Sequence, residues 1–244
     1  MSKRWILPHK ENKKSKYRLF CLPHAGTGAS LYAQWQQYID DEIEICCIQL
    51  PGRENRRKEH LCGEPDTLID SIAEEMKEYL DKPFAVFGYS MGGILAYELT
   101  MKIYEKFHVK PVKLFMSASS TFREKKETEV SEMDEPQLMD YMKRSGGVPM
   151  EILQDSVYRK EYFPIIQNDY RLVEQYRFPY KKVPCEIVAF ASTEDKEVSY
   201  ENVRLMQFFT PKFRLYPMKG NHFFIRKEYK KMEEIVSREM LCGA

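Results

Sequence analysis

Short apolar runs alternate with longer segments of helical period along most of the chain. The apolar runs are rich in β-branched and aromatic residues, which is typical of buried strands. They are Tyr17–Leu22, Ile43–Leu50, Phe84–Gly88, Val112–Ser117, Cys185–Ala191 and Phe213–Tyr216. The segments of helical period are Leu31–Asp40, Thr67–Leu80, Gly92–Phe107 and Lys227–Leu241. We expect Asp66 to be the N-cap of the second helix. Strands separated by helices predict an α/β fold with a mostly parallel sheet that is covered on both faces.

Residues 121–182 break this alternation. Charged turns and two or three short helices are expected there, including "EPQLMDYMKRSGG" and "DYRLVEQYRF", but no convincing strand. So long a stretch between two sheet strands favours an inserted helical cap within a single domain of residues 1–244. The residues alone leave open whether its aromatic side chains line a pocket or attach the cap to the body of the protein. These side chains are Tyr141, Tyr158, Tyr162, Phe163, Tyr170 and Tyr176.

Charge and composition exclude several classes of partner. Lys and Arg total 38 against 37 Asp and Glu, which gives a formal charge of +1. No basic field therefore favours nucleic acid or an anionic membrane. Hydrophobic residues make up 43% of the 244 residues, enough for one large core. No exposed apolar stripe is evident, so a monomer is expected.

The six cysteines form no CxxC pair, and most lie inside apolar runs such as "RLFCL" and "IEICCIQL". Free cysteines in such runs behave as small buried hydrophobic residues, and no metal-ligand spacing accompanies them. The N-terminal residues lack the unbroken apolar stretch of a secretory signal, and no window reaches the ~18 apolar residues that span a bilayer. We expect a reduced, soluble, cytoplasmic protein.

The stretch "FGYSMGG" places Ser90 between a predicted strand and a predicted helix. This is the context that a nucleophile elbow requires. A turn this tight brings the backbone so close at Gly88 and Gly92 that a Cβ would clash, and Gly93 gives further room for the helix. The start of the helix directs its free N–H groups toward the serine. Ser90 is therefore the candidate nucleophile.

A serine nucleophile needs a base and an orienting acid. Of the five histidines, His222 follows a late strand in "KGNHFFI", whereas His24 precedes the nucleophile and is expected to shape its own loop. The order serine, acid, histidine places the acid in "VAFASTEDKEV". Asp195 is the candidate, because a short acid at this turn can point inward. Glu194 and Glu197 are expected to face solvent.

The reaction also needs donors for an oxyanion. The N–H of Met91 comes with the elbow, and the loop "CLPHAGTGAS" follows an early strand. We expect Gly26 and Gly28 to turn this loop so that the N–H of Ala25 becomes the second donor.

The segments "LPHAGTGA", "LPGRENR", "FGYSMGG", "LFMSASS", "RSGGVP" and "GNHFFI" occur in this order. Together they resemble the type II thioesterases that accompany nonribosomal peptide and polyketide synthetases, from Tyr17 to about Val236. The resemblance implies an α/β-hydrolase fold with a helical lid, here residues 121–182. By position it implies Ser90 as nucleophile, His222 as base, Asp195 as its partner, and Ala25 with Met91 as oxyanion donors. The chain departs from the family's common pattern at Ser192, where a glycine is usual.

The resemblance also implies a substrate: short or misprimed acyl groups on the phosphopantetheine thiol of carrier proteins. Phosphopantetheine would arrive as part of that substrate, and no cofactor or metal is implied. Carrier proteins are typically acidic, so the basic run "GRENRRK", which spans Arg53–Lys58, is either a docking rim or a solvated loop. The alternatives are a medium-chain acyl carrier protein thioesterase of fatty acid synthesis, a small-molecule esterase, and a non-catalytic partner of a synthetase.

Overall fold

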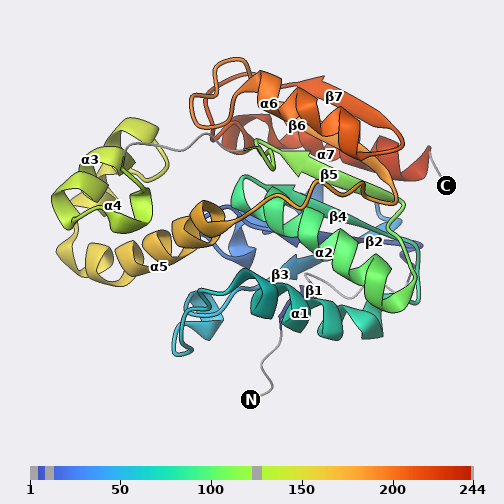
Figure 1. The fold of residues 1–244 in the computed structure, drawn as a ribbon, viewed down its shortest axis with the longest axis horizontal. Helices are drawn as coiled ribbons and strands as arrows, with labels where there is room; N and C mark the ends of the chain where they lie inside the picture. Colours follow the sequence, from blue (N-terminus) through green and yellow to red (C-terminus); the bar gives the residue numbers. More distant parts are fainter. Residues whose placement is uncertain (1–4, 9–13, 123–127, 243–244) are drawn as a thin grey trace.

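A seven-stranded sheet forms the centre of the computed structural model, which describes residues 5–8, 14–122 and 128–242 (Figure 1). The strands are β1 (Ile6–Pro8), β2 (Tyr17–Leu22), β3 (Ile43–Ile48), β4 (Phe84–Tyr89), β5 (Lys113–Ser117), β6 (Glu186–Ala191) and β7 (Phe213–Pro217). Their order across the sheet is β1-β3-β2-β4-β5-β6-β7. β1 pairs antiparallel with β3, and all other pairings are parallel. The predicted α/β class and mostly parallel sheet are thereby confirmed.

Helices cover both faces of this sheet (Figure 1). The α-helices are α1 (Pro65–Met76), α2 (Met91–Phe107), α3 (Glu135–Ser145), α4 (Met150–Gln154), α5 (Ser156–Gln175), α6 (Tyr200–Leu205) and α7 (Ile225–Leu241). The 3-10 helices are η1 (Ala29–Tyr32), η2 (Trp35–Gln37), η3 (Glu54–Arg56), η4 (Lys77–Tyr79), η5 (Val130–Glu132) and η6 (Met206–Phe209). Buried side chains of α1, α2 and α6 form one core with the sheet, and those of η1, η2 and α7 form a second core on its other face. The cores hold the carboxyl ends of the parallel strands at one edge, where Ser90 lies.

The six expected strands are present, but several other predictions need correction. The short strand β1 and helix α6 were not predicted. The expected helix at Leu31–Asp40 consists instead of η1 and η2. Tyr32 and Trp35 are drawn into the core, where they pack edge to face against each other and against Phe87. Tyr32 ends the first 3-10 helix and Trp35 begins the second, so the junction between the two short helices brings both rings into the core.

The expected N-cap at Asp66 is also wrong. Glu64 is the N-cap of α1, without a side-chain hydrogen bond, and Pro65 occupies the first helical position. Proline suits that position because its φ is already helical and its missing N–H would have no partner there. Asp66 lies in the first turn, where a carboxylate is favourable next to the helix dipole.

Between β5 and β6 the described residues contain η5, α3, α4 and α5 and no strand. These helices have a buried cluster of their own, which includes Tyr141 and Phe163. In Figure 1 they lie beyond the carboxyl end of β4, with α5 running back toward the sheet. The aromatic side chains serve both purposes left open by the sequence, since the hydroxyl of Tyr176 donates to Glu98 of α2 at 2.6 Å while Tyr170 lines the cavity described below.

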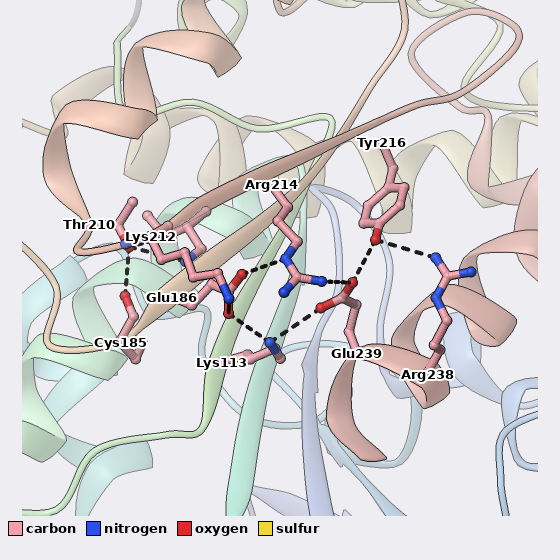
Figure 2. Close-up of polar contacts among 10 residues, drawn as sticks. Lys113, Cys185, Glu186, Thr210, Lys212, Arg214, Tyr216, Arg238 and Glu239 are labelled. Carbon is pink, nitrogen blue, oxygen red and sulfur yellow. Dashed lines mark hydrogen bonds and ion pairs between the residues drawn. The ribbon is translucent and has the colours of Figure 1, made fainter. Parts of the chain in front are cut away.

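At the opposite edge of the sheet, charged side chains form a network of ion pairs (Figure 2). The buried ammonium of Lys113 pairs with Glu186 at 2.7 Å and with Glu239 of α7 at 3.2 Å. Arg214 pairs with the same two carboxylates at 2.9 and 2.8 Å. Burial of Glu239 disfavours its charge, but hydrogen bonds from Tyr216 and Lys113 outweigh this and lower its pKa. The network thus ties the starts of β5 and β6 to the last helix.

Candidate active site

Ser90 lies on a sharp turn between the end of β4 and the start of α2. Its backbone is left-handed in φ, at φ +54 and ψ −118, which is uncommon for a residue with a side chain. Its N–H donates to the carbonyl oxygen of Ser117 at the end of the neighbouring strand β5, at 2.8 Å. Such strain persists only where the surroundings impose it, and here it lifts the hydroxyl above the sheet edge.

The glycines around Ser90 give the turn its room. A Cβ on Gly88 would lie 2.0 Å from the carbonyl oxygen of Gly92. A Cβ on Gly92 would lie 2.2 Å from the carbonyl oxygen of Leu22 at the end of β2, and one on Gly93 would lie 2.4 Å from the side chain of Ser119. The turn is therefore packed against the start of its own helix, the end of β2 and the loop after β5, and none of these three contacts leaves room for a side chain.

His222 connects Ser90 to Asp195. Its Nε2 lies 2.8 Å from Ser90 Oγ, and its Nδ1 lies 2.8 Å from Asp195 Oδ2. The side chain of His222 is only 8% exposed, so this contact is shielded from bulk water. With the proton on Nδ1 donated to the carboxylate, Nε2 is free to accept the proton of the serine. The three residues singled out from the sequence meet in one hydrogen-bonded chain.

The carboxylate of Asp195 is held by its own turn. Its Oδ1 accepts hydrogen bonds from the N–H groups of Glu197 at 2.8 Å and Val198 at 3.0 Å, which leaves Oδ2 for the imidazole. The prediction that Glu197 faces solvent is wrong, because Glu197 Oε2 accepts from the hydroxyl of Tyr141 on α3 at 2.8 Å. Glu194 is exposed as expected, but it also accepts from the N–H of Gly220 at 3.1 Å.

Two residues outside the predicted triad fix the histidine turn. The hydroxyl of Tyr89 donates to the carbonyl oxygen of His222 at 2.5 Å. The hydroxyl of Ser192 donates to the carbonyl oxygen of Gly220 at 2.6 Å. The departure from the family pattern at Ser192 thus supplies a tether between the acid turn and the histidine turn. One feature of the sequence could have indicated Tyr89: it carries a hydroxyl group at the end of the apolar run that precedes Ser90.

His24 is buried beside the triad but does not touch the serine. Its Nδ1 donates to the carbonyl oxygen of Ala25 at 2.9 Å, and its ring packs edge to face against Tyr89 and Phe223. Burial lowers the pKa of the His24 imidazole to about 4, so the ring stays neutral near pH 7. This agrees with a role in shaping the loop.

The loop after β2 brings Ala25 to the cavity that Ser90 and Met91 also line. Gly26 has the left-handed φ of +78 that turns this loop, as expected. Gly28 is extended at φ −128 instead, and its Cβ would lie 2.5 Å from the carboxyl group of Glu54. Gly28 is therefore needed for close packing and does not turn the loop, which corrects the sequence prediction.

The cavity next to Ser90 has a volume of about 280 Å³. Its apolar wall includes Met91, Ile94 and Val173. Besides Asp195, two further acidic residues line it: Glu197, and Glu174, whose carboxylate accepts from the N–H of Val130 at 2.8 Å. The cavity therefore has room for a small acyl group and combines apolar with acidic lining residues.

Two arginines of the basic run belong neither to a docking rim nor to a solvated loop, the two interpretations that the sequence left open. Arg53 and Arg56 are only 5% and 6% exposed. Arg53 pairs with Asp169, while Arg56 pairs with Glu59 and lies over the ring of Trp5. Their guanidinium groups are therefore paired with carboxylates inside the protein. Arg57 and Lys58 are the exposed basic residues of the run.

The structure bears on two further expectations, that the cysteines are reduced and that no segment spans a membrane. All six cysteines are free, and Cys21, Cys46, Cys47 and Cys185 are buried. Within the residues that the structure describes, no helix combines the length and the apolar character needed to cross a membrane.

Comparison with known proteins gives a consistent picture. Residues 17–239 match the thioesterase domain family. The gramicidin S biosynthesis protein GrsT of Aneurinibacillus migulanus is 30% identical over 244 residues, which cover 97% of this chain and 94% of that protein. The medium-chain S-acyl fatty acid synthase thioesterase of Homo sapiens is 28% identical over 222 residues, covering 88% and 83%. The structure of the type II thioesterase BorB from the borrelidin biosynthetic cluster superimposes with a TM-score of 0.87 at 26% identity, covering 96% and 97%. The chain belongs to the thioesterase family, on an α/β-hydrolase fold, as its resemblance to the type II thioesterases implied.

Proposed function

We propose that this protein is a serine thioesterase that hydrolyses short or misprimed acyl groups from the phosphopantetheine thiol of carrier proteins in nonribosomal peptide or polyketide synthesis. The observation that carries the proposal is the chain of two 2.8 Å contacts from Ser90 through His222 to Asp195. The setting of this chain in a thioesterase-family fold supports a thioester as the bond that is cleaved.

The proposed reaction has two halves. His222 Nε2 takes the proton of Ser90 as Oγ attacks the acyl carbon, and Asp195 stabilises the imidazolium that forms. The N–H groups of Ala25 and Met91 are the proposed donors to the oxyanion. Collapse of the tetrahedral intermediate expels the thiol, which receives the proton from His222. A thiol with a pKa of about 8.5 is a good leaving group, so little acid assistance is required.

Water completes the cycle. It approaches the acyl-serine, gives a proton to His222 Nε2 and attacks the same carbonyl carbon. The second intermediate collapses with return of that proton to Ser90 Oγ, which releases the carboxylic acid and restores the enzyme. Residues 121–182, of which 123–127 lie outside the described residues, are the proposed lid over this site, because Glu174, Val173 and Tyr170 of α5 line the cavity.

The cavity supports short acyl groups over medium chains. Its volume of about 280 Å³ lies just below the usual range of ligand pockets, which is roughly 300–1,000 Å³. A long alkyl chain would also meet the carboxyl groups of Glu174 and Glu197, and burying such groups against hydrocarbon is unfavourable. The similarity to a medium-chain fatty acid synthase thioesterase makes medium-chain release the second candidate.

One comparison tests the proposal. Acetyl, aminoacyl, octanoyl and dodecanoyl groups are loaded on carrier-bound phosphopantetheine, and their release is compared with that of the same groups on coenzyme A and in simple oxygen esters. We expect kcat/KM to be highest for short groups on the carrier and to vanish in Ser90→Ala. Faster release of the dodecanoyl group would favour the second candidate, and a preference for oxygen esters would contradict both.

A further inference from the structure

A buried ion pair joins α5 to the loop that carries Ala25. Asp169 of α5 is fully buried, and both of its oxygens face the guanidinium of Arg53, at 2.5 and 2.8 Å. Asp169 Oδ2 also accepts the N–H of Gly26 at 2.8 Å. A carboxylate without exposure to water needs such partners, and here one of them is the backbone directly after Ala25.

The same face of α5 packs on this loop. A Cβ on Gly26 would lie 2.7 Å from the hydroxyl of Tyr162 and 3.0 Å from a side-chain carbon of Ile166. Together with Asp169, these side chains are spaced four and three residues apart, so they lie along one side of the helix. Helix α5 therefore contacts Gly26 in two ways: Tyr162 and Ile166 pack against it, and Asp169 accepts a charge-assisted hydrogen bond from its N–H.

The contacts fix two successive peptide units. The Ala25 carbonyl oxygen accepts from His24 Nδ1, and the N–H of the same peptide unit, that of Gly26, is bound by Asp169. In the preceding unit, the carbonyl oxygen of His24 accepts from the N–H of Thr27 at 3.2 Å and from its hydroxyl at 2.8 Å. Arg53 in turn donates to the carbonyl oxygen of Thr27 at 3.1 Å.

This clamp determines where the Ala25 N–H points. In a trans peptide the N–H lies opposite the preceding carbonyl, so the Ala25 N–H points away from Thr27 once the His24 carbonyl is bound there. Ala25 lies at the wall of the cavity that holds Ser90. An oxyanion donor must be oriented before the charge develops, since reorientation during the reaction would cost the stabilisation that it supplies.

We propose that Asp169 and Arg53 are positioning residues of the oxyanion hole, so that the Ala25 donor is aligned only when α5 is seated on its loop. This inference rests on the proposed function. It gives α5 a part in the chemistry in addition to its place in the cavity wall. Neither residue touches the substrate, and both act through the backbone of residues 25–27.

Two double variants isolate the hydrogen bond to Gly26. Removing one member of a buried ion pair leaves an unpaired charge, so Arg53→Met accompanies both changes at position 169. Arg53→Met with Asp169→Asn retains an oxygen acceptor for the Gly26 N–H, whereas Arg53→Met with Asp169→Leu does not. The two proteins are otherwise matched in size and in charge. Glu186→Gln is the control for a lost buried ion pair at the distant edge of the sheet (Figure 2).

We expect kcat for the acetyl thioester of N-acetylcysteamine to be at least about 10-fold lower in the double variant with Asp169→Leu than in the one with Asp169→Asn, because one oxyanion donor contributes about 10²–10³ in kcat. KM should be similar in both, while an alkylboronic acid, which forms a tetrahedral adduct on serine, should bind more weakly to the variant without the acceptor. Glu186→Gln should lower the melting temperature and leave kcat within about 3-fold of the unmodified protein. Equal kcat and equal boronate affinity in the two double variants would overturn the inference.

A measurement on the unmodified protein covers the case in which a variant does not fold. The Gly26 amide should be protected from hydrogen exchange, and boronate binding should slow exchange at Ala25. Rapid exchange at Gly26 would contradict the clamp. Failure of the proposed function is distinguishable, because the unmodified protein would then cleave oxygen esters in preference to thioesters, whatever the double variants do.

Discussion

Replacing the acid by its amide, Asp195→Asn, changes one group in a site whose hydrogen bonds determine the outcome. Two N–H groups, from Glu197 and Val198, donate to Oδ1, so the amide oxygen must take this position. The amide NH₂ then lies where Oδ2 was, 2.8 Å from His222 Nδ1. A donor there forces Nδ1 to accept, which places the imidazole proton on Nε2. That tautomer cannot accept the proton of Ser90.

The size of the effect has a lower and an upper bound. In the flipped amide, the oxygen faces His222 but two buried N–H groups lose their acceptor, at a cost of at least about 1 kcal/mol each. Water cannot replace it, because the Asp195 side chain is 1% exposed. A cost of about 2 kcal/mol keeps the productive orientation below roughly one molecule in 30. The same substitution in a serine protease triad lowers kcat by about 10⁴, which corresponds to about 5 kcal/mol.

The assay is the release of thiol from the acetyl thioester of N-acetylcysteamine, followed with a chromogenic thiol reagent. Glu194→Gln is the matched control, since its amide oxygen can still accept from the Gly220 N–H, and it should stay within about 3-fold of the unmodified protein. A fall in kcat of less than about 30-fold in folded Asp195→Asn would refute the assignment of Asp195 and the reasoning from its turn.

Three further predictions concern stability and the elbow. The pKa of His24 in the folded protein, about 4, lies below its ordinary value of 6.5, so the unfolded chain binds the proton first as the pH falls. About 3 kcal/mol of stability should therefore be lost between pH 6.5 and 4. Urea titrations should show a smaller loss in His24→Asn. Burial raises the pKa of Glu233 to about 8, so its effect on stability has the opposite sign and stability is lost as the pH rises from 4.5 to 8. Glu233→Met should therefore raise the free energy of unfolding by roughly 3 kcal/mol at pH 7 and by much less at pH 5, and an equal gain at both would contradict this. Gly88→Ala would place a Cβ 2.0 Å from the carbonyl oxygen of Gly92, and kcat should fall by roughly 100-fold as the elbow opens, whereas unchanged kcat would show that the turn tolerates a side chain.

The sequence predicted the sheet and the elbow because both depend on local patterns. The inner strands β3 and β4 are buried on both faces and therefore appear as largely apolar runs. The elbow is a steric problem of a few residues, and its solution is written directly in Gly88 and Gly92. The serine, acid and histidine could be placed because their order follows from the strands that precede them.

The features that were missed depend on contacts between distant segments. The charged run around Arg53 looks solvated in sequence, and only the fold brings Asp169 to it, 116 residues further along the chain. Glu197 was expected in solvent because nothing nearby indicates that Tyr141 of α3 would reach it. The segment after β2 kept a helical period, but the packing of Trp35 in the core selected 3-10 turns.

The most direct test of the central claim is to trap the acyl group on the protein. Carrier-bound acetyl thioester is mixed with the unmodified protein and with Ser90→Ala, and both are quenched in acid during the first turnover. Peptide mass spectrometry should find one acetyl group on the peptide that contains Ser90, and none in Ser90→Ala. Hydrolysis that proceeds at full rate in Ser90→Ala, or an acetyl group found on any other residue, would contradict the account.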